Sequence, residues 1–376
     1  MAAGVPSAAD IALVLDHTQA EHPNRYNLGL PFNTCYKEPC LVRSNLMRCG
    51  GCRAVMYCTA QHQRADWPRH KNQCRLIKPA REELAVAEAA LRAMGAEAIA
   101  TGSDSDDPEG EREDPFTSPL TRGRLYLYPS ARPYMQARHN VISATLNVRT
   151  GESADIALEH CNEMLQLNRG DNQSVRDQVP SLMLRTGRDQ EAYDFLKWYL
   201  VRSRGYQYGD NTQPFLDLKG EDAFESPRQE WLNHSISLVH LAALTHLKTR
   251  LLLDIRMLAK HGRTEPDATY EKKMEWIRED ACSNILYSRR DIVDLGTAEH
   301  ANLATELETQ VKDVHRRVKE LNKHYWPALS HPERYSHALP TIYSLGSPQE
   351  VILAFRYTWY MWSECEPVMQ YVMRLA

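Results

Sequence analysis

Residues 35–74 read CYKEPCLVRSNLMRCGGCRAVMYCTAQHQRADWPRHKNQC, and this stretch holds six of the chain's nine cysteines together with two histidines. The eight candidate metal ligands are Cys35, Cys40, Cys49, Cys52, Cys58, His62, His70 and Cys74. Zinc takes four thiolate or imidazole ligands in a tetrahedron, and closely spaced pairs let one turn or helix deliver two ligands at once. Because the eight residues form four such pairs, they predict two four-coordinate zinc sites with no ligand left over.

The spacing within the pairs suits metal binding. Cys49 and Cys52 enclose two glycines, which permit a tight turn around the metal. The last two pairs each span four residues, a spacing that on a helix places both side chains on one face. The alternative is a small core of buried free cysteines. Residues 35–74 contain few Leu, Ile or Phe to build such a core, and a segment this small normally needs metal to fold.

The composition of the whole chain excludes several classes of protein. Of the 376 residues, 43% are hydrophobic and 25% are charged, and the mean hydropathy is −0.54, which describes a soluble globular protein. The most apolar stretch, 239–259, is interrupted by charged residues, so we expect no transmembrane helix. The N-terminus lacks the features of a secretory signal, and the cysteines cluster instead of forming a spread disulfide framework. We therefore expect an intracellular protein of the nucleus or cytoplasm.

The cysteine-rich stretch resembles the MYND-type zinc finger, whose motif ends in Y-C-x-x-x-[CH]-Q and W-x-x-H-x-x-x-C. This sequence supplies Cys49 and Cys52, then Tyr57-Cys58 and His62-Gln63, then Trp67, His70 and Cys74, although its first pair is spaced C-x4-C. The resemblance implies interleaved ligands, with Cys35, Cys40, Cys58 and His62 on one zinc ion and Cys49, Cys52, His70 and Cys74 on the other. Since protein ligands fill both sites, the two ions are expected to be structural.

The resemblance also implies a partner. Fingers of this type bind short proline-containing peptides, often P-x-L-x-P, along an exposed backbone edge near a glutamine and a tryptophan. The matching positions are Gln63 and Trp67, beside a predicted edge strand at 53–57, and Gly50 stands where some peptide-binding members have serine. Strand addition would supply affinity through main-chain hydrogen bonds and specificity through side-chain pockets. For Trp67 the alternative role is packing within a very small core.

Charge is uneven along the chain, although its formal total is −4. Residues 35–78 carry nine Lys or Arg against Glu38 and Asp66, a formal +7, and two sites with three thiolates each leave about +5. Such a basic segment could meet an acidic protein or nucleic acid. No aromatic stacking platform accompanies it, so direct binding of nucleic acid is not favoured.

The remainder of the chain predicts helices. Residues 75–100 are rich in Ala, Glu and Leu and predict a helix, and 101–120 predict an acidic disordered linker after which residues 121–376 form an all-α domain. Predicted helices at 152–167 and 189–204 resemble tetratricopeptide-type helices, with Ala157 and Ala192 spaced near that family's period. The fold class is thus a two-zinc finger, after an N-terminal extension at 1–34, followed by a helical-repeat-like domain.

Two enzyme classes carry this type of finger. SET-type lysine methyltransferases have an N-H-S motif, and residues 233–235 repeat it without the cysteine that follows and within helical sequence. Iron-dependent prolyl hydroxylases need an H-x-D or H-x-E pair on a β-fold, and only His331 and Glu333 fit the looser form. We therefore favour a zinc-binding interaction adaptor or co-regulator without catalytic residues. A methyltransferase with a divergent cofactor site and a DNA-associated transcriptional regulator remain alternatives, and the oligomeric state is left open.

Overall fold

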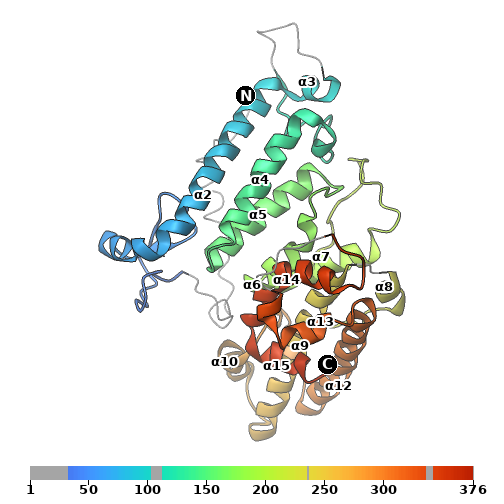
Figure 1. Cartoon of the computed structure of the whole chain (residues 1–376). Coiled ribbons are helices and arrows are strands. Elements are labelled where there is room, and N and C mark those ends of the chain that lie inside the picture. Colours follow the sequence, from blue (N-terminus) through green and yellow to red (C-terminus); the bar gives the residue numbers. More distant parts are fainter. Residues whose placement is uncertain (1–32, 103–111, 235–236, 336–341, 376) are drawn as a thin grey trace, which may run out of the picture.

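The computed structural model of the chain describes residues 33–102, 112–234, 237–335 and 342–375. All but the last two residues of the predicted N-terminal extension lie outside these ranges. Two short strands, β1 (Met47–Arg48) and β2 (Met56–Tyr57), pair in antiparallel fashion, with Met47 opposite Tyr57. Helices make up most of the remaining described chain (Figure 1), so the predicted fold class, a two-zinc finger followed by a helical domain, is confirmed.

The helix that leaves the finger, α2 (Ala60–Met94), is a single element of 35 residues. It begins at Thr59, whose side chain accepts a hydrogen bond from the His62 N–H, as an N-cap does. It ends at Gly95, which has a φ of 77°, and the short helix α3 (Ala96–Thr101) follows. The prediction of a separate helix at 75–100 was therefore wrong at both ends. The last three ligands, His62, His70 and Cys74, share one helix with the Ala-rich sequence that follows them.

The predicted linker at 101–120 is also too long. Thr101 is the last residue of α3, and residues 103–111 lie outside the described chain. Residues 112–120 are held in place, because Arg92 of α2 binds Asp114 and stacks over the ring of Phe116, which is itself buried. Aromatic burial of this kind outweighs the acidic composition on which the prediction rested.

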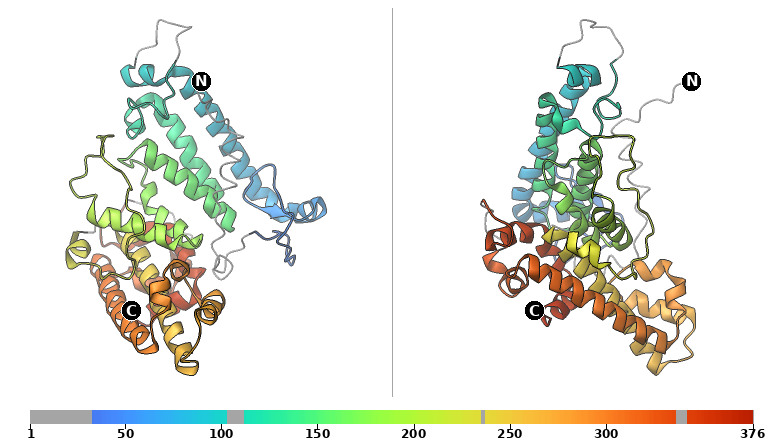
Figure 2. Two further views of the ribbon diagram at one scale, coloured as in Figure 1. Left: turned by 180° about the vertical axis from the view of Figure 1, so that it is seen from behind. Right: turned by 90° about the vertical axis from the view of Figure 1, so that its right-hand side faces the viewer.

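The helical body continues through twelve further α-helices in the described chain. They are α4 (Arg132–Thr145), α5 (Gly151–Leu167), α6 (Val179–Arg185), α7 (Asp189–Val201), α8 (Gln229–His234), α9 (Leu238–Thr264), α10 (Tyr270–Asp280), α11 (Arg290–Val293), α12 (Thr297–Leu321), α13 (Tyr325–Leu329), α14 (Pro348–Ser363) and α15 (Glu366–Met373). Single 3-10 turns occur at Leu125–Leu127, Pro129–Ala131, Val175–Asp177, Ile285–Ser288 and Pro332–Arg334. Helices α2, α4 and α5 lie side by side, and α9 packs along α12 (Figure 2).

Helices α5 and α7 lie where the sequence predicts helices at 152–167 and 189–204, and each pairs with the helix before it, α4 or α6. Pro180 lies in the first turn of α6, where its missing N–H costs no hydrogen bond. The resemblance of these pairs to tetratricopeptide repeats stays a prediction.

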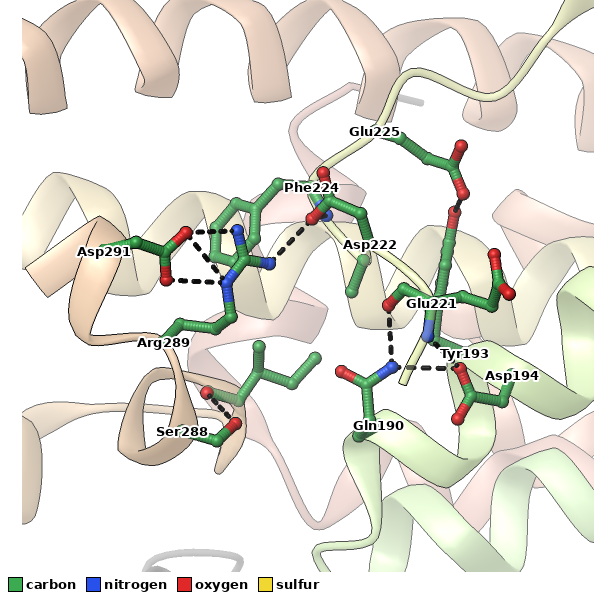
Figure 3. A network of polar contacts seen from close by, with 12 residues as sticks. Gln190, Tyr193, Asp194, Glu221, Asp222, Phe224, Glu225, Ser288, Arg289 and Asp291 are labelled. Atoms are coloured by element: carbon green, nitrogen blue, oxygen red, sulfur yellow. Dashed lines mark hydrogen bonds and ion pairs between the residues drawn. The ribbon is translucent and has the colours of Figure 1, made fainter. Parts of the chain in front are cut away.

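A segment of irregular backbone, residues 219–225, which ends in a turn, is bound to the helical body along its length. Its first backbone N–H groups donate to the carboxylate of Asp194 in α7, and two of its carbonyls accept hydrogen bonds from the fully buried Lys248 of α9. Arg289 binds Asp222 from a third side (Figure 3). These contacts tie the segment to α7, α9 and the turn before α11.

The finger is docked directly on the helical body. Thr150, which caps α5, donates a hydrogen bond of 2.7 Å to the Ala54 carbonyl of the finger. The Asn33 N–H donates to Glu152 in the first turn of α5, and Val148 belongs to the small core of the finger. Together with the packing of α2 on α4, these contacts make finger and helices one body. The predicted arrangement, in which an acidic linker tethers the finger to the helical domain, was wrong because α2 itself joins them.

Glu152 makes this junction sensitive to pH. Burial raises the pKa of its carboxyl from 4.5 to about 7, so the folded chain holds a proton there that the unfolded chain releases. The stabilisation is therefore present below pH 4.5 and is lost as pH rises through 7, amounting to about 3 kcal/mol. We expect Glu152→Gln to raise the melting temperature more at pH 7.5 than at pH 5. Glu306→Gln, an exposed position on α12, is the control. A stability gain that stays constant with pH would contradict this assignment.

Candidate metal centre

The first metal cluster lies where the start of the finger meets α2. Its four ligands are Cys35, Cys40, Cys58 and His62. Cys35 forms a bridge with Met56 of β2, Cys58 directly follows β2, and His62 lies in the first turn of α2. The Nδ1 atom of His62 is 3.2 Å from the Cys58 Sγ and 3.5 Å from the Cys35 Sγ. The Sγ atoms of Cys40 and Cys58 are 3.8 Å apart.

The second cluster is buried between the β1–β2 connection and a later part of α2, where His70 and Cys74 lie one turn apart. Its ligands are Cys49, Cys52, His70 and Cys74, all of them buried. The Cys52 Sγ is 3.3 Å from the His70 Nε2, and the Sγ atoms of Cys49 and Cys74 are 3.9 Å apart. A Cβ at Gly51 would come within 2.6 Å of the Cys74 Sγ, so only glycine permits this close approach.

Both clusters fit zinc. Tetrahedral zinc with Zn–S bonds near 2.3 Å and Zn–N bonds near 2.0 Å separates two sulfurs by about 3.8 Å and a sulfur from a nitrogen by about 3.5 Å. The observed separations lie close to these values, and within each cluster all ligand atoms are within 4.8 Å of one another. Each cluster supplies four protein ligands, which fill the tetrahedron, so the two zinc ions are structural. The interleaved pairing expected from the family resemblance is the pairing that the structure shows.

The electrostatics of the second cluster favour a bound cation. Hydrogen bonds from Cys52 and His70 lower the pKa of the Cys49 thiol, whereas the pKa of Cys52 is raised because its proton is shared with the Cys49 thiolate. Without a cation, therefore, one thiolate is stabilised at the expense of its neighbour. A divalent ion removes this competition and allows all three thiols to ionise.

Sequence reasoning missed the polar contacts that support the ligands. The buried carboxylate of Asp66 accepts hydrogen bonds from the Tyr57 hydroxyl and from the Arg69 Nε, each 2.8 Å long. Arg69 also binds Glu38 and stacks over the ring of Tyr36 at 4.3 Å. Arg69 therefore stabilises the finger together with Glu38 and Asp66, the two acidic residues of the basic segment 35–78. The spacing of Asp66 and Arg69, three apart on a helix, was the available signal.

The residues assigned to peptide binding lie on the outside of the finger. Trp67 is 42% exposed, its ring packs edge-on against His70, and Gln63 lies one turn before it on α2. Gly50 is exposed, two residues after β1. The prediction that 53–57 is an edge strand was wrong, because β2 has β1 on one side and Cys35 on the other. Within the described residues, the outer edge of the sheet is β1.

Comparison with known proteins identifies the finger. Residues 33–74 match the family model "MYND finger". Over 39 residues the chain is 51% identical to Egl nine homolog 1 of Mus musculus, which is 10% of each chain. Over 42 residues it is 43% identical to the human histone-lysine N-methyltransferase SMYD3, covering 11% of this chain and 10% of that protein. Over 62 residues it is 39% identical to SET domain-containing protein 14 of Caenorhabditis elegans, covering 16% and 14%.

These matches concern the finger region. The chain spans only about a tenth to a seventh of the length of the curated relatives it matches, and no solved structure matches it significantly. Residues 33–74 are therefore a MYND finger, a zinc-binding protein-interaction module. None of the helices in the described parts of the chain combines the length and apolar character needed to cross a bilayer.

Proposed function

We propose that the finger captures proline-containing peptides from partner proteins and that the chain acts as an intracellular adaptor or co-regulator in the nucleus or cytoplasm. The observation that carries this proposal is the exposure of Trp67 on a zinc-stabilised helix turn, with Gln63 one turn away. A large aromatic side chain on a rigid surface is the kind of anchor that dominates peptide and protein interfaces.

The neighbouring backbone supports strand addition. Both residues of β1 are exposed, and within the described chain no backbone group of either pairs outside the β1–β2 ladder. Leu41, Val42 and Met47 are exposed on the same small module. An extended peptide added to β1 would find main-chain partners along the strand and apolar side chains around it.

The helical body offers a second binding surface in this proposal, with α4 to α7 arranged as two repeat-like helix pairs. No observation favours the enzymatic alternative. His331 and Glu333 are both exposed, and among the described residues only the two zinc clusters group metal ligands. The matches to methyltransferases cover the finger, and Ser235 of the N-H-S sequence lies outside the described residues.

The test is fluorescence anisotropy of a labelled P-x-L-x-P peptide with the zinc-loaded full chain. We expect Trp67→Ala to weaken binding by about tenfold or more, because it removes the central anchor. Val86→Ala is the matched control, since Val86 is 71% exposed on the same helix but lies beyond the finger. Equal affinity of the Trp67→Ala chain would exclude this surface. If the chain instead binds duplex DNA, with an affinity that falls as salt rises, and does not bind the peptide, the alternative of a DNA-associated transcriptional regulator is favoured.

A further inference from the structure

A cavity of about 390 Å³ lies in the helical body, away from the finger. It opens between the end of α7, the start of α9 and the first turns of α14. The side chains that matter for its chemistry are Tyr199, Tyr208, Tyr357, Arg176, Asp177 and Glu350. Its size is that of a small-ligand site, and it combines aromatic and apolar walls with a few polar groups, as such sites do.

One polar group in the wall lacks a partner. The hydroxyl of Tyr199 is buried, and no described residue forms a hydrogen bond with it. Buried hydroxyls in folded proteins are almost always satisfied by protein, water or ligand. The Tyr199 hydroxyl is thus a buried group without a hydrogen-bond partner among the described residues, and the Tyr199 side chain forms part of the cavity wall.

The charges around the cavity favour a cation. Arg176 is paired with Asp171, whose carboxylate is 3.6 Å from its Nε, and its guanidinium already lies over one face of the Tyr199 ring, 5.9 Å from the ring centroid. Among the described residues, Asp177 contacts two neutral polar groups, the Ser237 hydroxyl and the imidazole of His240, whose pKa is lowered by burial. With Glu350 the titratable side chains lining the cavity therefore sum to a negative charge.

The aromatic walls have the matching property. Burial raises the pKa of Tyr357 to about 12, so its ring is a neutral phenol at physiological pH, and the pKa of Tyr199 is raised for the same reason. Neutral aromatic faces attract cations through their quadrupole, and several of them around one site form a cage for ammonium groups. A cation on an alkyl stem would also contact the apolar side of the cavity at Leu238, Leu353 and Ala354.

We propose that this cavity binds an alkylammonium group, with Tyr199, Tyr208 and Tyr357 around the cation and Asp177 as its counter-charge. The same chemistry is found in a lysine side chain of a protein, methylated or not, and in a free quaternary ammonium compound. The proposal is independent of peptide capture by the finger, because no zinc ligand or finger residue lines the cavity.

The experiment is isothermal titration of the zinc-loaded full chain with four probes. They are choline, a short peptide with trimethyllysine, the same peptide with lysine, and the same peptide with norleucine, which keeps the stem and removes the charge. We expect at least one ammonium probe to bind about tenfold more tightly than the norleucine peptide. Tighter binding of choline than of the peptides would indicate a free ammonium compound as the ligand, and tighter binding of a peptide would indicate a lysine side chain of a protein. Binding of the norleucine peptide as tight as that of the ammonium probes, or no binding of any probe, would overturn the proposal.

Three variants test the assigned roles. Tyr357→Ala is expected to weaken ammonium binding by about tenfold and Asp177→Asn by about fivefold, whereas Tyr357→Phe keeps the ring and should keep the affinity. Tyr126→Ala, at a tyrosine outside the cavity, is the control. If Tyr357→Ala fails to fold, the comparison of Tyr357→Phe with Asp177→Asn still tests the proposal, because the first should keep the affinity for ammonium and the second should lower it. If Asp177→Asn binds the ammonium probes with unchanged affinity, Asp177 is not the counter-charge of the site.

Discussion

Replacement of Cys49 and Cys52 by serine is expected to cost the chain both zinc ions and to unfold residues 35–74. These two residues ligate one site only, yet the ligands of the two sites alternate along the chain and share α2. Loss of the second zinc ion frees the connection between β1 and β2, so the pairing of these two strands is lost. That pairing positions Cys58, which is a ligand of the first zinc ion. Structural zinc contributes roughly 10 to 16 kcal/mol to small domains of this kind, which is more than the finger's small core can replace.

The helical body should survive this change. Helix α2 packs on α4, and Leu84 and Leu91, in the part of α2 beyond the finger, belong to the large core, which contains no zinc ligand. We therefore expect fast amide hydrogen exchange in 35–74 and continued protection in α9, with zinc content measured by mass spectrometry.

Cys282→Ser, at a cysteine outside both clusters, serves as the control and should retain two zinc ions. A double mutant that keeps one full equivalent of zinc would show that the two sites fold independently.

The second large effect is expected at a buried ion pair in the helical body. The Nη1 of Arg250 in α9 is 2.7 Å from the Oδ1 of Asp189, and the two side chains are 1% and 0% exposed. The other carboxylate oxygen of Asp189 accepts the Asn284 N–H, and Arg250 also donates to the Leu184 carbonyl. This pair therefore joins α9, the start of α7 and the turn after α10.

Arg250→Ala leaves the Asp189 carboxylate buried and uncompensated, which costs about 3 to 5 kcal/mol. Urea unfolding followed by circular dichroism measures this loss. Arg256→Ala is the matched control on the same helix: it removes an ion pair with Glu308, but Arg256 is 40% exposed and the pair contributes about 1 kcal/mol or less. Replacing both Arg250 and Asp189 by apolar residues should recover part of the loss. Equal destabilisation by the two single variants would contradict the role of burial.

The zinc sites were predictable because their information is local. Every ligand pair lies within six residues, so covalent spacing already restricts where its side chains can meet. The helices predicted at 152–167 and 189–204 were likewise recognisable from nearby residues, and α5 and α7 lie there. The contact between Asp66 and Arg69 was not predictable, because polar pairs three residues apart are common on solvent-exposed helices. Only the burial of the Asp66 carboxylate distinguishes this pair.

The errors have a common cause. Residues 112–120 were assigned to a disordered linker from composition, and the finger was separated from the helices for that reason. Composition does not report that Arg92 reaches Phe116, or that Thr150 reaches Ala54 across the fold. Such contacts join residues far apart in the chain, and their energy exists only once both elements are in place.

By itself, therefore, the sequence determined the metal, its eight ligands and the helical character of the rest, because zinc chemistry and helix periodicity act over a few neighbouring residues. Only the tertiary structure decided that α2 joins finger and helices into one body and that a buried Lys248 and the Arg250–Asp189 pair hold α9 to its neighbours. The same is true of the four tyrosines that line one cavity. These features depend on desolvation, which exists only in the packed chain and cannot be assigned to a residue from the sequence alone.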